Sequence, residues 1–299
     1  MIEIKNVTKR FDKAPVLEHL NCKIEKGSIY GLVGANGAGK STLLRLIMGI
    51  YKQDEGTILV DGEVSFDNPV IKQRMAFVPD DLFFFSGYTL YEMATFYQNI
   101  YESFDIDYFK QLCALFRLDV NRRVSTFSKG MKRQGALIIA IATKASYLFF
   151  DETFDGLDPV IRNLVKKIIC ESVAKDNTTI ILTSHNLREL EDTCDHLGLL
   201  YKGGILFESD VDTLKTKMFK VQISLSKDFD EEEFKKLEVM SFKKKGSVAT
   251  IIIKGDKEKA KTYLEKKDPV ILDFIPLTLE EIFIYEMEVL GYEFESVIL

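Results

Sequence analysis

A glycine-rich segment is the first part of the sequence whose residue types and spacing could do chemistry. GANGAGKST, residues 34–42, fits G-x-x-x-x-G-K-[ST] and lies between an apolar run and a run with helical spacing. Its glycines let backbone N–H groups turn inward around phosphate oxygens, Lys40 can reach the β- and γ-phosphates, and Ser41 offers a hydroxyl to Mg²⁺. A chance match is the alternative, and the strand-to-helix context disfavours it. The predicted phosphate loop consists of Gly34, Ala35, Asn36, Gly37, Ala38, Gly39, Lys40, Ser41 and Thr42.

Two acids follow a short apolar run further along the chain. SYLFFDE, residues 146–152, places Asp151 and Glu152 at the end of a predicted buried strand. A loop that hydrolyses its nucleotide needs a second anchor for Mg²⁺ and a group that polarises the attacking water. We predict the first role for Asp151 and the second for Glu152. Many ordinary strands end in an acid, so this interpretation depends on the phosphate loop.

A second place for an anion lies in STFSKGMKRQ, residues 125–134. Ser128, Lys129 and Gly130 stand just before a long apolar stretch, which predicts a helix that starts at Ser128. A helix N-terminus with a hydroxyl and a glycine is suited to binding an anion. The alternative is an ordinary helix cap. A chain with one complete phosphate loop therefore offers a second candidate phosphate site.

The elements that must position these residues alternate between strand and helix over the first two-thirds of the chain, which is typical of an α/β fold with a parallel sheet. Residues 57–64 contain a D-G turn and predict a hairpin. Helical patterns without any strand pattern occupy residues 83–145. The predicted strands of the α/β core are 28–34, 74–80, 146–152, 178–184 and 196–203.

The pattern changes near residue 218. We expect a domain at 1–218 with a helical subdomain at about 83–145, followed by a small α+β domain at 219–299. The second domain should contain strands at 219–225, 247–255 and 269–277, an acidic helix at 230–237 and a helical segment at 256–267. A capping box of Thr278 and Glu281 should start its last helix.

Composition narrows the class of protein. The chain has 299 residues, of which 46% are hydrophobic, and a formal net charge of −6, which argues against a general nucleic-acid binder. Its four cysteines are scattered, so we expect reduced, buried thiols rather than a zinc site or disulfides. The first residues lack a signal-peptide core, and the apolar run at 136–150 is too short to span a bilayer. We expect a soluble, intracellular protein.

The order of these parts resembles the nucleotide-binding subunits of ABC transporters, over residues 1 to about 218. In that family the second anion segment is a signature motif, usually LSGGQ. Here it reads FSKGM, so Ser128 and Gly130 match, whereas Lys129 and Met131 follow a variant found in the drug- and peptide-export branch. The resemblance implies ATP and Mg²⁺ as cofactors. It also implies a head-to-tail homodimer, in which Ser128, Lys129 and Gly130 hold the γ-phosphate of ATP bound to the other subunit.

The resemblance assigns three more residues that bind nucleotide. Phe11 should stack on adenine, with a core phenylalanine as the alternative. Asp158, in DGLDP, should touch the partner subunit, and it is also a natural helix N-cap followed by Pro159. His185, just after the strand at 178–184, should hydrogen-bond the γ-phosphate. The predicted catalytic residues are thus Glu152, His185 and Lys40.

One position departs from the family pattern. Asp80 stands where the family usually has a glutamine that contacts Mg²⁺ or water and senses the membrane partner. A carboxylate can ligate Mg²⁺ through its oxygens but cannot donate a hydrogen bond when ionised. We therefore include Asp80 among the nucleotide-binding residues and, with Ser41 and Asp151, among the predicted metal ligands.

The function implied is that of the ATPase subunit of a membrane exporter of drugs, lipids or peptides, at the cytoplasmic face of the membrane. ATP binding would close the dimer and hydrolysis would reopen it, driving transport through a separate transmembrane subunit. A soluble ABC-type ATPase is the alternative, and a dead cassette is disfavoured because Lys40 and Glu152 are intact. The aromatic cluster Phe83, Phe84, Phe85, Tyr88 and Tyr91 is either core or a docking groove for that subunit. Nothing in the sequence indicates the cargo, and regulation, dimer contact and stability remain open as roles for the last domain.

Overall fold

The computed structural model describes residues 1–12 and 14–289. Contacts divide the chain into two compact units, Met1–Glu208 and Ser209–Leu299. This division falls earlier than the predicted boundary after residue 218, because helix α8 (Val211–Lys217) packs against α10 (Leu279–Val289) and so belongs to the second unit. The end of the predicted second domain, 290–299, lies outside the described residues.

The centre of the first unit is a six-stranded sheet in the order β10-β9-β3-β8-β7-β6. Strand β3 pairs in parallel with β8 and β9, and β7 pairs in parallel with β6 and β8. Every residue of β3, β7 and β8 is buried, as expected for strands covered on both faces. The strands are β3 (Ile29–Val33), β6 (Met75–Val78), β7 (Tyr147–Asp151), β8 (Thr179–Ser184), β9 (His196–Tyr201) and β10 (Gly204–Asp210).

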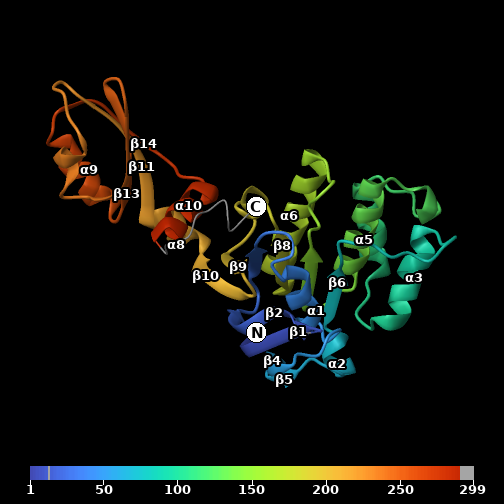
Figure 1. Ribbon diagram of the computed structural model, residues 1–299. Coiled ribbons are helices and arrows are strands. Elements are labelled where there is room, and N and C mark those ends of the chain that lie inside the picture. Colours follow the sequence, from blue (N-terminus) through green and yellow to red (C-terminus); the bar gives the residue numbers. More distant parts are fainter. Residues whose placement is uncertain (13, 290–299) are drawn as a thin grey trace. The chain divides into compact units, whose positions relative to one another are not determined.

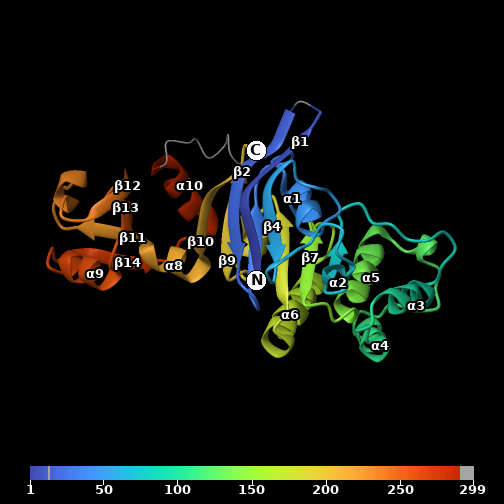
Figure 2. The same ribbon diagram turned by 90° about the horizontal axis from the view of Figure 1, so that it is seen from below.

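A second, antiparallel sheet has the order β2-β1-β4-β5, and Figure 2 shows β2, β1 and β4 side by side. The predicted hairpin is confirmed: β4 and β5 pair across Asp61 and Gly62, whose φ angles of 51° and 84° are those of a tight two-residue turn. The strands are β1 (Ile2–Phe11), β2 (Ala14–Ile24), β4 (Glu55–Val60) and β5 (Glu63–Val64).

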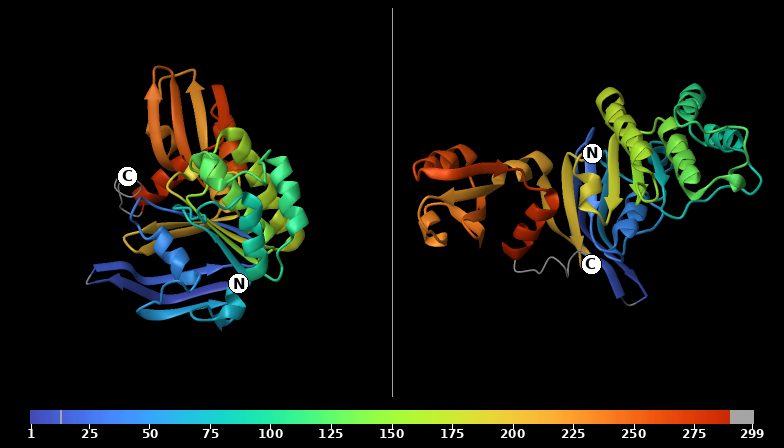
Figure 3. Two further views of the ribbon diagram at one scale, coloured as in Figure 1. Left: turned by 90° about the vertical axis from the view of Figure 1, so that its right-hand side faces the viewer. Right: turned by 90° about the horizontal axis from the view of Figure 1, so that it is seen from above.

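Helix α1 (Lys40–Ile47) lies between the two sheets and packs on β4 and β7 (Figures 1 and 3). Its apolar side chains join those of β1, β2 and β4 in one core cluster, which fixes the start of the helix beneath the phosphate loop. Helix α6 (Pro159–Asp176) packs on β8 on the other side of the parallel sheet. Two single-turn helices, α2 (Pro69–Lys72) and α7 (Leu187–Leu190), complete this part.

Residues 83–145 form a helical segment, drawn in green at one side of the first unit in Figure 1. It contains α3 (Leu90–Ile100), α4 (Ile106–Leu115), the 3₁₀ turn η1 (Val124–Thr126) and α5 (Lys129–Ala142). Helix α5 contacts α3, α4 and β6, so it joins the helical segment to the parallel sheet. Within the described residues this segment holds no named strand.

The second unit is a four-stranded antiparallel sheet, ordered β12-β13-β11-β14, with α9 (Lys257–Glu265) packed on β14. The predicted acidic helix at 230–237 is wrong: only the 3₁₀ turn η2 (Glu231–Phe234) forms, followed by an unpredicted strand, β12 (Glu238–Lys245). The predicted capping box is confirmed, since Thr278 N lies 3.0 Å from Glu281 Oε2. The other strands are β11 (Met218–Leu225), β13 (Val248–Lys254) and β14 (Pro269–Ile275).

Candidate functional site

The predicted site residues of the first unit follow the carboxyl ends of parallel strands. The phosphate loop follows β3, Asp80 follows β6, Asp151 and Glu152 end β7, and His185 follows β8. Because β8 lies between β3 and β7 in the sheet, these strand ends meet at one edge. This edge is where open α/β sheets bind their ligands.

The phosphate loop needs its glycines. Gly37 and Gly39 have φ angles of 84° and 108°, and a Cβ on Gly34 would come within 2.5 Å of the carbonyl oxygen of Leu200. Lys40 begins α1 and is only 5% exposed, with Nζ 2.6 Å from the carbonyl oxygen of Gly34. The loop therefore ends at a helix N-terminus with a buried cation, an arrangement suited to phosphate.

The two acids of β7 are held by the neighbouring strand. Asp151 is 1% exposed, and the Thr183 hydroxyl donates to its Oδ1 at 2.7 Å while accepting from the backbone N–H of Glu152 at 3.0 Å. Glu152 has a φ angle of 48°, a left-handed conformation that costs free energy for a residue with a side chain. Thr183, which the sequence analysis did not single out, thus fixes the positions of both acids.

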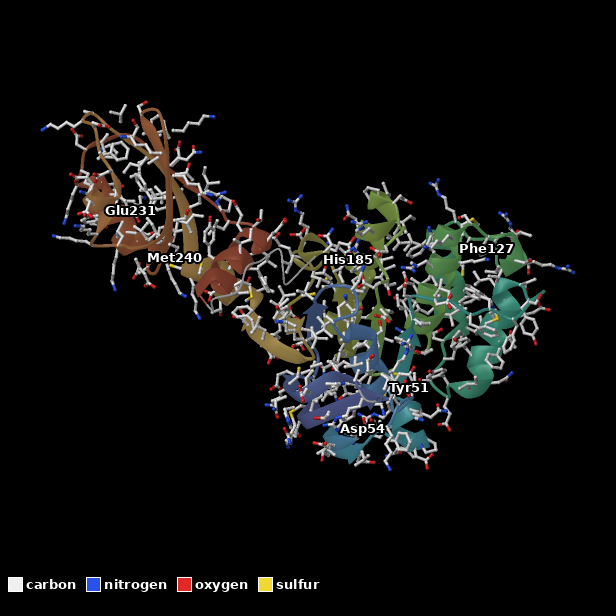
Figure 4. All side chains as sticks on the ribbon, viewed as in Figure 1. Tyr51, Asp54, Phe127, His185, Glu231 and Met240 are labelled. Atoms are coloured by element: carbon white, nitrogen blue, oxygen red, sulfur yellow. The ribbon has the colours of Figure 1, made fainter. Side chains whose placement is uncertain are left out.

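The carboxylate of Glu152 brings together residues from three strand ends. Its Oε1 lies 3.0 Å from Lys40 Nζ, and its Oε2 lies 3.0 Å from His185 Nδ1. Lys40 and Glu152 are well buried, whereas the His185 side chain is 43% exposed. Figure 4 shows His185 in the middle part of the first unit. Lys40 and His185 therefore each contact Glu152, and the catalytic roles of the three residues stay predictions.

The residues present fit a divalent cation. Asp151 Oδ2 is buried and has no hydrogen-bond partner among the described residues, and Asp151 and Ser41 offer the hard oxygen ligands that Mg²⁺ prefers. Potential ligand atoms of Glu152, Asp155 and His185 also lie within 4.8 Å of one another. Asp155 was not predicted from the sequence; it follows Glu152 by three residues in the turn after β7.

Asp80 contacts a cation rather than the acids of β7. Its Oδ1 lies 2.7 Å from Nη2 of Arg133, a side chain on α5 that is only 2% exposed. The sequence analysis missed Arg133. The signal available in the sequence was a charged residue at the start of the apolar stretch that follows Ser128. In the structure that stretch is α5, which packs on β6. The metal role of Asp80 stays a prediction.

The predicted signature segment starts a helix, as expected. The Ser128 hydroxyl accepts from Met131 N at 3.2 Å, and Ser128 and Lys129 are exposed. A Cβ on Gly130 would lie 3.3 Å from the carbonyl oxygen of Gly156, so this helix start abuts the turn that leads to Asp158. Asp158 is exposed and caps α6 through bonds of 3.1 Å to the N–H groups of residues 160 and 161, as predicted.

Phe11 is not a core residue. It is 41% exposed at the end of β1, where its ring meets that of Tyr51 edge-on with centroids 5.4 Å apart. The core alternative is therefore excluded, and Lys9 Nζ lies over the ring at 5.4 Å from its centroid. Its contact with adenine stays a prediction.

The aromatic cluster after Asp80 is also largely exposed. Phe83 is 72% exposed, and Tyr88 and Tyr91 are exposed as well, which excludes the core reading for these three residues. Phe83 and Phe84 line a pocket of about 190 Å³ together with Pro79, Leu82, Met93, Tyr97 and Tyr101. Burial raises the pKa of Tyr101 to about 12, so its hydroxyl stays neutral and donates to the carbonyl oxygen of Met75 at 2.8 Å. Among the described residues, no helix has the length and apolar character needed to cross a bilayer.

Comparison with known proteins identifies the family. A family model described as ABC transporter matches residues 17–155. The ABC transporter ATP-binding protein YtrB of Bacillus subtilis is 32% identical over 95% of this chain and 97% of its own length. The lantibiotic transport ATP-binding protein SrtF of Streptococcus pyogenes is 30% identical over 71% of this chain and 92% of its own. A solved structure of an ATP-binding subunit of an ABC transporter superposes with a TM-score of 0.67 at 26% identity, covering 72% of this chain and 92% of that one.

The family model spans the phosphate loop and both acids, and the similarity to YtrB covers nearly the whole chain. The fold is accordingly the α/β P-loop cassette, followed by an additional antiparallel sheet. The chain belongs to the ABC transporter family as an ATP-binding subunit, an ATPase that hydrolyses ATP to drive transport.

Proposed function

We propose that this ATPase serves an exporter, as a head-to-tail homodimer on a separate transmembrane subunit, with Mg²⁺ as its second cofactor. The observation that carries the proposal is that Lys40 and His185 each contact Glu152, the residue after Asp151, at the ends of three neighbouring strands. A cation, two acids and a histidine at a phosphate loop are the groups that metal-assisted hydrolysis of a triphosphate needs.

In the proposed reaction, Lys40 exchanges its contacts with the Gly34 carbonyl and Glu152 for oxygens of the β- and γ-phosphates. Ser41 and Asp151 would hold Mg²⁺, which would supply positive charge to offset that of the phosphates. Glu152, released from Lys40, orients the attacking water and accepts its proton. His185 then donates a hydrogen bond to the γ-phosphate, next to the base that it already contacts.

The head-to-tail dimer is supported by the exposure of the signature segment. Ser128, Lys129 and Asp158 all face solvent, and the close approach of Gly130 to Gly156 makes their two segments parts of one surface. Figure 4 places Phe127, next to Ser128, well apart from His185 within the first unit. A second copy can bring its exposed Ser128 to the phosphate loop without any rearrangement of the fold, and twofold symmetry completes both sites together.

The docking site that we propose for the transmembrane subunit is the exposed aromatic cluster and the pocket beneath it. Phe83, Tyr88 and Tyr91 offer apolar area that a helix of the partner would cover. This contact would hold the chain at the cytoplasmic face of the membrane. Export as the direction is supported by the SKGM variant and by the name of the relative SrtF, a lantibiotic transport protein.

A soluble ABC-type ATPase is the second candidate. Co-expression with a polytopic membrane protein that is a candidate transmembrane subunit distinguishes the two candidates. An exporter subunit should co-purify with that membrane protein in detergent and change its ATPase rate. Failure to co-purify with any such protein, with an unchanged ATPase rate, would favour the soluble alternative.

The test of the site is Glu152→Gln, which removes the charge but keeps the size of the side chain. Hydrolysis should fall by roughly 100-fold or more, because general base catalysis contributes about 10²- to 10⁴-fold, while Mg-ATP binding persists. Phosphate release measures the rate, and size-exclusion chromatography with ATP should show a stable dimer. Glu171→Gln, at an exposed position on α6, is the matched control. Hydrolysis at the parental rate, or a variant that stays monomeric with ATP, would contradict the assignment of Glu152.

A further inference from the structure

Arg133 is a buried cation to which the proposed hydrolysis gives no role. Its Nη2 donates to the Asp80 carboxylate at 2.7 Å and to the Asp80 carbonyl oxygen at 3.1 Å, and its Nη1 donates to the carbonyl oxygen of Glu152. A guanidinium is a planar fork that can donate in two directions at once. Arg133 thereby joins the loop after β6 to the backbone that follows β7.

Asp80 compensates the buried charge of Arg133. A buried cation is costly unless a counterion and hydrogen bonds compensate it, and Asp80 is the carboxylate that pairs with Arg133. The Asp80 side chain itself is 61% exposed, so the pair runs from the surface to the interior. This pairing accounts for an acid at a position where the family usually has glutamine.

The Nη1 group of Arg133 contacts the backbone of Glu152, the residue proposed as the general base. Glu152 holds a left-handed backbone conformation, and its two peptide groups are fixed from different sides. Thr183 accepts from its N–H, and Arg133 donates to its carbonyl oxygen. Loss of the Arg133 contact would leave the Glu152 carbonyl oxygen with only the N–H of Asp155, at 3.3 Å, and so weaken one of the two sides from which its backbone is held.

We propose that Arg133 is a positioning residue that ties the backbone of Glu152 to Asp80, so that the hydrolysis rate depends on the Asp80–Arg133 pair. The inference rests on the proposed role of Glu152. Pro79 and Leu82, on either side of Asp80, line the pocket proposed for the transmembrane subunit. A partner bound in this pocket would move the loop that contains Asp80, which holds Arg133. Arg133 would transmit that movement to the backbone of Glu152, which carries the catalytic carboxylate.

The kinetic test is a cycle of Arg133→Gln, Asp80→Asn and the double variant. Each single change should lower kcat by about 10- to 100-fold, the range for hydrogen bonds to charged groups. KM for ATP should stay within about twofold, since the contacts of both side chains among the described residues lie outside the phosphate loop. The double variant should be no slower than Arg133→Gln, because Asp80 has no cation to compensate once the charge is gone. Lys110→Gln removes an equal charge from an exposed site on α4 and should leave both constants unchanged.

A structural readout separates positioning from simple stabilisation. In Arg133→Lys, which keeps the charge but not the fork, amide hydrogen exchange should rise at residues 80–82 and 152–155 and stay unchanged along α5. This variant also serves if Arg133→Gln fails to fold. Additive losses of kcat, a rise in KM alone, or faster exchange along all of α5 would each overturn the proposal. If the parental chain failed to hydrolyse ATP, the proposed function would fail, and the exchange experiment would still decide whether Arg133 couples the two segments.

Discussion

In the first unit, charged side chains are buried where parallel strands end, whereas the interior of the second unit is apolar. Lys40, Arg133, Asp151 and Glu189 are all buried in the first unit. In the second unit, Ser224 is the one buried polar residue among those described. The buried polar atoms that lack a hydrogen-bond partner in the described chain, such as Asp151 Oδ2, all belong to the first unit.

This difference indicates that buried charges at the site of the first unit lower its folding stability. Burying a charge opposes folding unless it is fully compensated, and such residues concentrate at functional sites. The second unit shows the usual alternative, with charged pairs such as Lys259 and Asp256 at the surface and a continuous core of phenylalanine, valine and isoleucine. Substitutions in the first unit should therefore affect activity more than stability, and core substitutions in the second unit should do the reverse.

The largest expected effect tests the charged site together with the dimer. Lys40→Ala and Ser128→Arg should each abolish nearly all ATPase activity, because the first removes the cation for the phosphates and the second blocks the signature helix. In a mixed dimer both lesions fall on one composite site, and the other site is intact. Mixing the two inactive proteins should restore ATP-dependent cross-linking of differently tagged subunits, and hydrolysis too if one site can act alone. Absence of recovery in both measurements would show that Ser128 does not serve the partner's ATP.

A core substitution in the second unit should have the opposite signature. Phe234 is fully buried against Phe229 and Phe242, so Phe234→Ala should destabilise this unit by about 3–5 kcal/mol. Calorimetry should show the unfolding transition of the second unit at a lower temperature. The transition of the first unit, whose midpoint temperature ATP raises, should stay unchanged. Val270→Ala, at an exposed position on β14, is the control and should shift neither transition. Equal destabilisation of both transitions would mean that the two units do not differ as described.

The smallest effect concerns an exposed ring of the first unit. Phe11→Ala should weaken ATP binding by about 1–3 kcal/mol, the range for stacking of a base on an aromatic side chain, with little change in maximal turnover. Titration with a fluorescent ATP analogue measures the affinity, and Val64→Ala on the same sheet is the control. Unchanged affinity would leave Phe11 as a surface aromatic that contacts Tyr51 and Lys9.

The sequence predicted best what depends on local patterns. The continuous apolar runs of β3, β7 and β8 and the spacing of the phosphate loop are local signals, as are the helix caps at Ser128 and Asp158. The unpredicted strand β12 has a polar sequence, EVMSFKKK, and lies at the edge of its sheet, where pairing with β13 decides its conformation.

The site was predicted less completely for the same reason. The contacts of Thr183 with Asp151 and of Arg133 with Asp80 join residues 32 and 53 positions apart in the chain. Neither residue type carries a spacing rule that would reveal such a partner. Asp80 illustrates the limit: a motif can indicate that its position matters, but the identity of its counterion emerges only when α5 packs on β6.

The pairing of β3 has a consequence for synthesis of the chain. Both sheet partners of β3, β8 and β9, lie in residues 179–201, whereas the strand itself is complete at residue 33. At translation rates of about 5–20 residues per second, roughly 10–30 s pass between synthesis of β3 and synthesis of the first strand that pairs with it. During that interval an apolar segment with high β-propensity lacks its sheet, which is a recognised aggregation hazard. The nascent chain should therefore depend on chaperones until β8 emerges, and ATP can contribute to its stability only after that point.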